Sequence, residues 1–387
     1  MTDDETGDDA STGGDVSISP PPPPEDAAPP QCTETITSLT GVNADLTPGA
    51  VVCLAAGTYG VVNLTANPSS NATLTAAPGA HVVVAGVQIT GSHLTVSQLH
   101  STGGITLSPP ANHDIVDHND VTNSAGGYGI DLGCNGVAQP GCSYITISGN
   151  RVHDFTSTTT GDGDAIRLDG WANVTVTGNE IFHVEQQPGA DQGHCDCLQS
   201  YNADATTHDF VFDHNYVHDN QCEGPPFLKD GDISTNVTIT DNLDVRGHNM
   251  SEDDTAIFLV ENTNNAIIRN NTYQGTNGCA IEAQGTAPNP TAMVDHNVLD
   301  ELNLSGTPSY KLVEDYNIFT DGNEWSFTLA THDLPQGPYG TKYAPTFMCG
   351  SSCGDGTAAG DDYRLSTNPN GIGIDWAPAS RTFGPSN

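Results

Sequence analysis

A short motif that ends in asparagine recurs eight times along the chain. In each copy a few β-forming residues alternate with polar ones, and Asn follows two or three positions later, as in residues 144–150 and 173–179. The motifs end at Asn119, Asn150, Asn179, Asn215, Asn242, Asn271, Asn297 and Asn317. Their spacing, from 20 residues (317 − 297) to 36 residues (215 − 179), is typical of a solenoid, and the period-2 alternation predicts a strand in every repeat. Aligned asparagines at a bend predict a ladder of side-chain amides that bond from rung to rung.

A second strand is expected between successive copies of the motif. Matching residues 161–167 to residues 193–199 sets its register. The inward column of this strand is then Ile130, Ile166, Leu198, Leu228, Ile257 and Ile281. Because side chains alternate along a strand, the residues on either side of this column point outward.

This repeat resembles the right-handed parallel β-helix of the pectate-lyase-like superfamily (pectin lyase fold). The resemblance covers roughly residues 76–320. Residues 48–59 look like the start of the first coil, and residues 362–365 and 371–375 look like the terminal segment of bacterial β-helix proteins. The resemblance implies an all-β solenoid of roughly nine to ten rungs. The superfamily hosts lyases, hydrolases, epimerases, esterases and non-catalytic adhesins, so the fold does not select a reaction.

The chain is strongly acidic, and its charge is unevenly spread. Nine Lys and Arg stand against 48 Asp and Glu, for a net charge of −39. This balance excludes a protein that tracks a nucleic-acid backbone, because such proteins need a basic footprint. Residues 1–31 hold eight acidic side chains, no basic one and the proline run at 20–24, which predicts a disordered spacer. We expect an N-terminal cap over residues 32–75 and an irregular C-terminal cap over residues 321–387.

Cysteine content and hydropathy indicate the compartment. No apolar stretch reaches about 18 residues, so no transmembrane segment is expected. The charged start lacks a signal-peptide core, as in a mature chain whose leader has been removed. Ten cysteines favour disulfides and an oxidising compartment. The sequence-close pairs are Cys32/Cys53, Cys134/Cys142 and Cys349/Cys353, and pairing stays open for Cys195, Cys197, Cys222 and Cys279. We expect a secreted or cell-surface monomer.

Candidate site residues lie in the two outward columns beside the second strand. One column contains Asp131, Arg167, Gln199, Lys229, Phe258 and Glu282, and the other contains Tyr128, Asp164, Asp196, Pro226, Thr255 and Cys279. Asp162 and His194 fall on the same side as the second column. Neighbouring rungs are about 4.8 Å apart, so these groups are expected to share one patch. Two of only nine basic residues, Arg167 and Lys229, fall in one column, which indicates that they are placed against the negative field.

The charged patch suits cleavage of a uronate polysaccharide by β-elimination. That reaction needs a neutralised carboxylate, a base and a stabilised leaving oxygen. The candidate ligands for Ca2+, which prefers oxygen donors, are Asp162, Asp164 and Asp196. Lys229 or Arg167 is the candidate base, a severe demand for arginine, whose pKa exceeds about 12. His194 is the easier acid or base near neutral pH, and Asp196 completes the catalytic set. Many lyases of the superfamily use calcium with a cationic base, which the resemblance implies here.

Other readings of the same patch stay open. The candidate substrate-binding residues are Gln199, Trp171, Tyr201, Asp131 and Glu282, with the aromatic rings as platforms for sugar faces. Asp164 and Asp196, one rung apart, are also eligible as the carboxylate pair of a glycoside hydrolase. A third alternative is a non-catalytic surface adhesin or glycan-binding module. Loops of unequal length after each rung argue against a plain stalk, because binding grooves are built from such loops.

Overall fold

The computed structural model describes most of the chain from residue 31 onward. The described residues are 31–123, 127–134, 142–156, 163–185, 195–201, 208–222, 224–229, 235–245, 257–260, 263–274, 279–283, 291–299, 302–306, 311–320, 333–335, 347–348, 362–367 and 371–385. From Cys32 onward the chain forms one compact unit.

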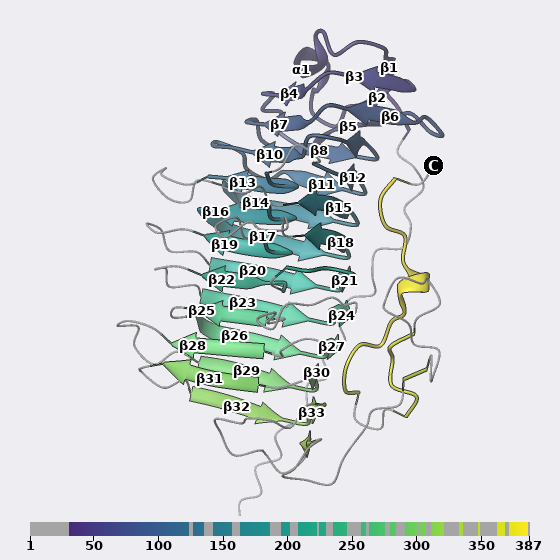
Figure 1. The fold of residues 1–387 in the computed structure, drawn as a ribbon. Helices are drawn as coiled ribbons and strands as arrows, with labels where there is room; N and C mark the ends of the chain where they lie inside the picture. The colour runs from purple at the N-terminus through teal and green to yellow at the C-terminus, as the bar shows by residue number, and fades with distance from the viewer. Residues whose placement is uncertain are drawn as a thin grey trace, which may run out of the picture. The chain divides into compact units, whose positions relative to one another are not determined.

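Three parallel sheets account for nearly all regular structure in this unit (Figure 1). Sheet A contains β1 (Glu34–Ile36), β2 (Val51–Leu54), β5 (Ala72–Ala76), β8 (Leu94–Ser97), β11 (Ile115–Asp117), β14 (Cys142–Ser148), β17 (Trp171–Thr177), β20 (His208–Asp213), β23 (Thr235–Thr240), β26 (Asn264–Arg269), β29 (Thr291–Asp295) and β32 (Lys311–Asp315). Sheet B contains β3 (Gly57–Tyr59), β6 (Val82–Val84), β9 (His100–Ser101), β12 (Asp120–Val121), β15 (Arg151–Thr156), β18 (Glu180–Glu185), β21 (Tyr216–His218), β24 (Leu243–Val245), β27 (Thr272–Gln274), β30 (Val298–Leu299), β33 (Ile318–Phe319) and β34 (Leu334–Pro335).

Sheet C completes each coil. It contains β4 (Val62–Leu64), β7 (Val87–Ile89), β10 (Ile105–Leu107), β13 (Ile130–Gly133), β16 (Ile166–Asp169), β19 (Leu198–Tyr201), β22 (Phe227–Lys229), β25 (Ile257–Val260), β28 (Cys279–Ala283) and β31 (Leu302–Gly306). From β2 to β33 successive strands fall into sheets A, B and C in turn, so each full coil contributes one strand to each sheet. The expected parallel β-helix is therefore confirmed, with a third strand per coil. The described helical segments are α1 (Val42–Asp45) and the 3₁₀ turn η2 (Pro378–Ser380), and neither is long and apolar enough to cross a membrane.

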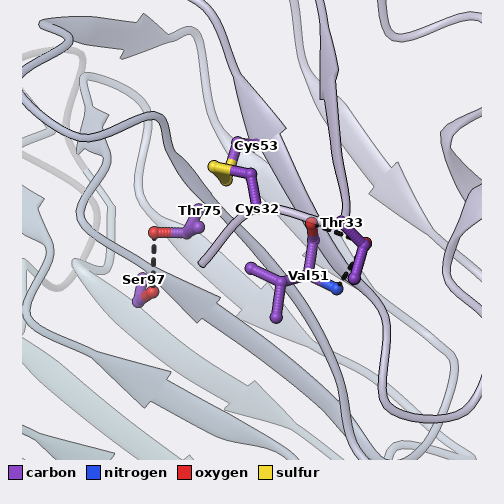
Figure 2. The surroundings of a disulfide bond; sticks show 6 residues. All are labelled: Cys32, Thr33, Val51, Cys53, Thr75 and Ser97. Atoms are coloured by element: carbon purple, nitrogen blue, oxygen red, sulfur yellow. Dashed lines mark hydrogen bonds between the residues drawn. A yellow bond between two sulfur atoms is a disulfide. The ribbon is translucent and has the colours of Figure 1, made fainter. Parts of the chain in front are cut away.

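The stack begins earlier than the asparagine motif predicts. Strand β1 pairs with β2, so part of the expected cap at residues 32–75 already belongs to the sheets. Figure 2 shows how this first pair is joined: a disulfide links Cys32 to Cys53, and the Thr33 hydroxyl donates to the Val51 carbonyl at 2.9 Å. These early coils have no ladder asparagine, so the asparagine motif does not predict their strands.

The asparagine ladder is present at all eight motifs. Each Nδ2 donates to the Oδ1 of the next asparagine at 2.9 to 3.1 Å, from Asn119 through to Asn317. Backbone amides of the same residues donate to the same oxygens, so each ladder side chain is fully used. The residue before each asparagine adopts positive φ, for example +62° at Gly149 and +56° at Asp241. Gly, Asn, Asp and His tolerate this conformation best, which explains why they dominate that position.

Stacked apolar columns fill the interior of the coils. The sheet A column runs through Leu74, Val96, Val116, Ile147, Val176, Phe212, Ile239, Ile268 and Val294, all fully buried. A buried carboxyl group interrupts a neighbouring apolar column of sheet A. Asp114 occupies the rung position of Leu94 and Ile145, and its side chain is completely buried.

The C-terminal region does more than close the last rung. Strand β34 pairs with β33 and extends sheet B. Residues 371–385, which we call the strap, instead run back along the side of the stack, as the yellow segment in Figure 1 shows. Their backbone amides bond to His296 at one end and to Gly149 at the other. Ile372, Ile374 and Trp376 pack on the outward apolar side chains of sheet B.

Substitution of Gly129 by alanine is expected to destabilise the fold by about 2 kcal/mol, because overpacking a tight site forces the backbone apart. A Cβ at Gly129 would lie 2.4 Å from the Ala165 carbonyl oxygen and 2.6 Å from the Phe155 ring. Urea denaturation measures the effect. Gly60 is the matched control, since a Cβ there meets nothing within 4 Å. An equal loss in both variants would show that the tight β13–β16 contact is not the cause.

Candidate functional site

The outer face of sheet C carries the residues expected to form the site, but in a different register. Ile130 pairs with Ile166 and Ile166 with Leu198, as expected. From the next rung the pairing shifts by two residues, so that Leu228 pairs with Ser200 and Ile281 with Leu259. A shift of two keeps every side chain on its face, because the alternation has a period of two.

The shift divides the expected outward column. Asp131, Arg167 and Gln199 follow one another, but the next member is Phe227 rather than Lys229. The expected succession from Gln199 to Lys229 is therefore wrong: Lys229 pairs with Tyr201 in the adjacent outward column. Glu282 belongs to that adjacent column as well, opposite Val260.

Arg167 is the centre of the described cluster. Its side chain is only 6% exposed, Nη1 donates to Asp164 Oδ2 at 2.9 Å, and Nε donates to Asp169 Oδ1 at 3.1 Å. Nη1 also donates to Gln199 Oε1. The ring of Tyr128 lies 5.3 Å from the guanidinium carbon. Burial lowers the pKa of Arg167, but the charges of Asp164 and Asp169 outweigh it and raise that pKa further. Arg167 therefore stays a cation, which corrects its assignment as a candidate base.

Asp164 and Asp196 are completely buried rather than presented to solvent. Asp164 Oδ2 accepts from Arg167, and Asp164 Oδ1 accepts from the Asp196 backbone amide at 3.1 Å. Both oxygens of Asp164 are thus engaged by protein donors, which does not fit the expected calcium site. The same engagement argues against Asp164 and Asp196 as a hydrolytic pair. Asp162 and His194, the other residues expected near them, lie outside the described residues.

Asp131 is the described carboxyl group best suited to proton transfer. Its pKa is raised to about 6, first by burial and then by the charge of Asp169, against a smaller opposite effect of Arg167. Its Oδ1 is buried and accepts no hydrogen bond from any described residue. Burial likewise raises the pKa of Asp169, although Arg167 opposes it. Asp169 was not predicted from the sequence. It could have been found from its position two residues beyond Arg167, on the same face of one strand.

The expected substrate contacts divide into three groups. Trp171 is fully buried, donates from Nε1 to Ser200 Oγ at 2.9 Å and packs on Phe210, so its ring is a core residue and not a sugar platform. Gln199 is also buried, and its amide oxygen accepts a hydrogen bond from Arg167. Tyr201 and Glu282 hold outward strand positions, as does Lys229, which was expected as the base, but the side chains of all three lie outside the described part of the structure.

Three disulfides join cysteines among the described residues. The expected pairs Cys32–Cys53 and Cys134–Cys142 are formed, and Cys195 pairs with Cys222. Cys195 precedes β19 and Cys222 precedes β22, so this bridge joins the two rungs that carry Gln199 and Lys229. Cys197 is buried. Cys349 and Cys353 lie outside the described residues.

Within the described residues, one group of three side chains has metal-ligand spacing. Asp213, His214 and Asp241 place one ligand atom each within 4.8 Å of the others. They lie at the corner between sheets A and B, not on sheet C. Burial raises the pKa of Asp241 to about 6, with His214 acting in the opposite direction. Within this group His214 Nδ1 contacts Asp213 Oδ2 at 2.7 Å.

Comparisons with known proteins add similar folds. No family model matches the sequence, and no curated protein matches it significantly. Similar solved structures include the pectate lyase Pel9A, at 12% identity and TM-score 0.46 over 88% of this chain and 91% of that one. They also include an alginate lyase from Paenibacillus sp. str. FPU-7, at 14% identity and TM-score 0.34 over 74% and 99%. The PL6 alginate lyase AlyGC matches at 12% identity and TM-score 0.37 over 91% and 57%. The fold of this chain therefore rests on its own strand pairing, which makes it a parallel β-helix.

Proposed function

We propose that the protein is a secreted or cell-surface enzyme that cleaves a uronate-containing polysaccharide by β-elimination at the outer face of sheet C. The observation that carries the proposal is Asp131, a carboxyl group with a pKa of about 6, on the strand next to the fixed cation Arg167. An acid that exchanges its proton near neutral pH beside a permanent positive charge suits a substrate that carries a carboxylate. Three disulfides among the described cysteines support an oxidising compartment.

Each step of the elimination has a proposed residue. Lys229 removes the proton on the carbon next to the uronate carboxylate, and the electron pair of that C–H bond forms a carbon–carbon double bond. The glycosidic carbon–oxygen bond breaks, and Asp131 gives its proton to the leaving oxygen. Arg167, held by Asp164 and Asp169, is the proposed cation nearest the uronate carboxylate. Because Asp164 does not fit a calcium site, no step is assigned to a metal ion.

The test is the product formed from a panel of polygalacturonate, alginate, glucuronan and neutral glucans. We expect ultraviolet absorbance from an unsaturated uronate with at least one acidic polymer and none with the neutral glucans. Lys229→Ala should lower kcat about a hundredfold, the usual contribution of a general base. The exposed Lys311 on β32 is the matched control, and Lys311→Ala should retain full activity. No product from any acidic polymer contradicts the proposal.

Substitution Asp131→Asn should lower kcat by about a hundredfold, because the proton donor is lost. In the unsubstituted enzyme, kcat should fall as the pH rises through about 6, where Asp131 loses its proton. The pH–rate profile of both proteins measures this limb, which should be absent from the variant. Asp117→Asn on sheet A, also partly exposed, should leave the profile unchanged. An unaltered profile in Asp131→Asn would assign the limb to another group.

Hydrolysis is the second candidate, and one observation favours it. Asp169 raises the pKa of Asp131 through its charge, so the two carboxyl groups form a coupled pair of the kind that glycosidases use. In that case new reducing ends appear without the absorbance of an unsaturated product, and Asp169→Asn is as harmful as Asp131→Asn. A binding module without catalysis would yield neither product.

A further inference from the structure

The outer face of sheet B carries an alternating row of histidines and carboxylates that the proposed reaction does not use. The contacts run from His100 to Asp120 (2.9 Å), Asp120 to His153 (2.5 Å), His153 to Asp154 (2.8 Å), Asp154 to His183 (3.2 Å) and His183 to Asp219 (2.7 Å). We call these residues the His–Asp row. It crosses the rungs of β9, β12, β15 and β18 and ends just after β21, which are neighbours in the stack (Figure 1).

His153 occupies the middle of the row and contacts two carboxylates at once. Nε2 lies 2.5 Å from Asp120 Oδ1, and Nδ1 lies 2.8 Å from Asp154 Oδ2. Ionised carboxylates only accept hydrogen bonds, whereas a neutral imidazole has one donor nitrogen. Both contacts can be hydrogen bonds only if His153 is an imidazolium. Its side chain is only 13% exposed, so water does not readily replace a lost partner.

The electrostatics agree with this geometry. Burial by itself lowers the pKa of His153, but the hydrogen bonds and charges of Asp120 and Asp154 outweigh it and raise that pKa above its ordinary value. Burial raises the pKa of Asp120, and His153 and His100 together bring it below its ordinary value. The pKa of Asp154 is lowered in the same way, with burial opposed by His153 and His183.

A stack of rings connects His153 to the strap. His153 lies flat on Phe182 (4.6 Å between centroids), Phe182 on His218 (5.0 Å), and His218 on Tyr216 (4.3 Å). Tyr216 in turn contacts Phe383 of the strap at 6.3 Å. All but the last ring belong to sheet B, so the stack passes from rung to rung before it reaches the C-terminal segment.

A second contact joins the strap to the same face. Arg151 lies over the Phe182 ring at 5.1 Å and donates to Glu180 at 2.7 Å, and Glu180 also contacts His218. The Gly384 amide donates to the Gly149 carbonyl at 2.8 Å. A Cβ at Gly384 would lie 2.8 Å from Arg151 Cδ, so the strap is seated directly on this arginine.

We propose that His153 is a pH-sensitive latch for the strap. As an imidazolium between Asp120 and Asp154, it holds the ring stack on which the strap is seated, an arrangement that we call the clasp. Deprotonation of His153 loosens the strap. A histidine whose pKa is raised on folding stabilises the folded state fully below its unfolded pKa of about 6.5, and this stabilisation is lost as the pH rises through the folded pKa. The strap should therefore be closed in mildly acidic solution and loosen above neutrality. At strongly acidic pH, protonation of Asp120 and Asp154 removes the same contacts.

The proposal depends on the other charged and titratable groups that surround His153. Those on the packed elements are His81 before β6, His100 on β9, Asp120 on β12, Arg151 and Asp154 on β15, Glu180 and His183 on β18, and His218 and Asp219 at β21. The charged groups of the strap, Asp375 and Arg381, act on Asp213 and Asp241 instead. Asp241, whose pKa burial raises to about 6, also lies beside the strap, so the His153→Gln variant is what assigns the response to the His–Asp row.

The test is hydrogen–deuterium exchange of residues 371–385 in the full chain at mildly acidic and mildly alkaline pH, corrected for intrinsic exchange. We expect about tenfold faster exchange on the alkaline side, the factor that one pKa unit of coupling supplies. His153→Gln keeps a donor but cannot ionise, so it should exchange at the fast rate at both pH values. His208→Gln is the matched control, because the described ion pair of His208 is with Asp209, outside the His–Asp row, and it should retain the wild-type response.

Two results overturn the proposal. One is a strap whose corrected exchange does not change with pH, and the other is a pH response that persists in His153→Gln. Should His153→Gln fail to fold, the wild-type protein still decides the question through histidine NMR: the clasp requires that His153 titrate above about 6.5. Phe383→Ala should then abolish the response of the strap while the His153 titration remains.

Discussion

Replacing Asn215 by alanine is expected to lower the free energy of unfolding by about 4 kcal/mol. Asn215 Nδ2 donates to Asn242 Oδ1 and to the Val176 carbonyl, each at 3.0 Å. Its Oδ1 accepts from the backbone amide and the Nδ2 of Asn179, again at 3.0 Å. Alanine removes all four bonds and leaves buried donors and acceptors in neighbouring rungs without partners, at about 1–3 kcal/mol each before relaxation.

Urea denaturation with matched variants checks this expectation. Asn67→Ala is the control, because Asn67 is exposed and its described side-chain bonds are with the Thr65 carbonyl and the Ser92 hydroxyl. It should change stability by less than about 0.5 kcal/mol. A similar small loss in Asn215→Ala would mean that water replaces the ladder bonds, and that the ladder does not hold the rungs together.

Replacing Asp114 by asparagine is expected to remove a pH-dependent loss of stability of about 3 kcal/mol between roughly pH 5 and pH 8. Burial raises the pKa of Asp114 from 3.8 to about 7, against smaller opposing effects of the Leu94 and Asn112 amides. The folded protein therefore binds a proton that the unfolded chain has released. Stability falls as the pH rises from about 3.8 to about 7 and is constant beyond that point. Asp114 Oδ1 accepts from the Leu94 amide at 2.8 Å, a bond that the asparagine oxygen retains.

The quantity to measure is the difference in unfolding free energy between wild type and variant across this range. A difference removes the contributions of Asp131 and Asp241, whose pKa values of about 6 fall in the same region in both proteins. Asp117→Asn is the control, since Asp117 lies three residues further on and its side chain is 31% exposed. A wild-type minus Asp114→Asn difference that does not vary with pH would show that Asp114 ionises freely in the folded state.

Local repetition made the fold readable from the sequence. Each ladder asparagine follows a residue that tolerates positive φ and a strand of alternating apolar residues, and all three signals lie within about seven positions. No contact between distant residues was needed to recognise them. The same reasoning correctly aligned Ile130, Ile166 and Leu198, where one rung follows another with similar local sequence.

The arrangement of the site residues could not be predicted from the alternation of apolar and polar residues. A two-residue shift leaves every inward residue inward, so the apolar pattern could not reveal that Gln199 faces Phe227 while Lys229 faces Tyr201. Exposure was equally hidden: Asp164 and Asp196 are on the expected rungs, but they are covered, and Asp164 is engaged by Arg167. Strand alternation predicts only the direction in which a side chain points. Whether that side chain is buried depends on the segments that pack over it.

The sequence by itself determined a parallel solenoid with an asparagine ladder, because strand alternation and bend chemistry are properties of neighbouring residues. Only the tertiary structure decided which charged groups meet. The His–Asp row joins side chains from five rungs, and the strap brings Gly384 against Arg151 across more than two hundred residues of sequence (384 − 151 = 233). Such contacts follow from the length of the coils between the strands, which vary from rung to rung, and from a return path that no local pattern encodes.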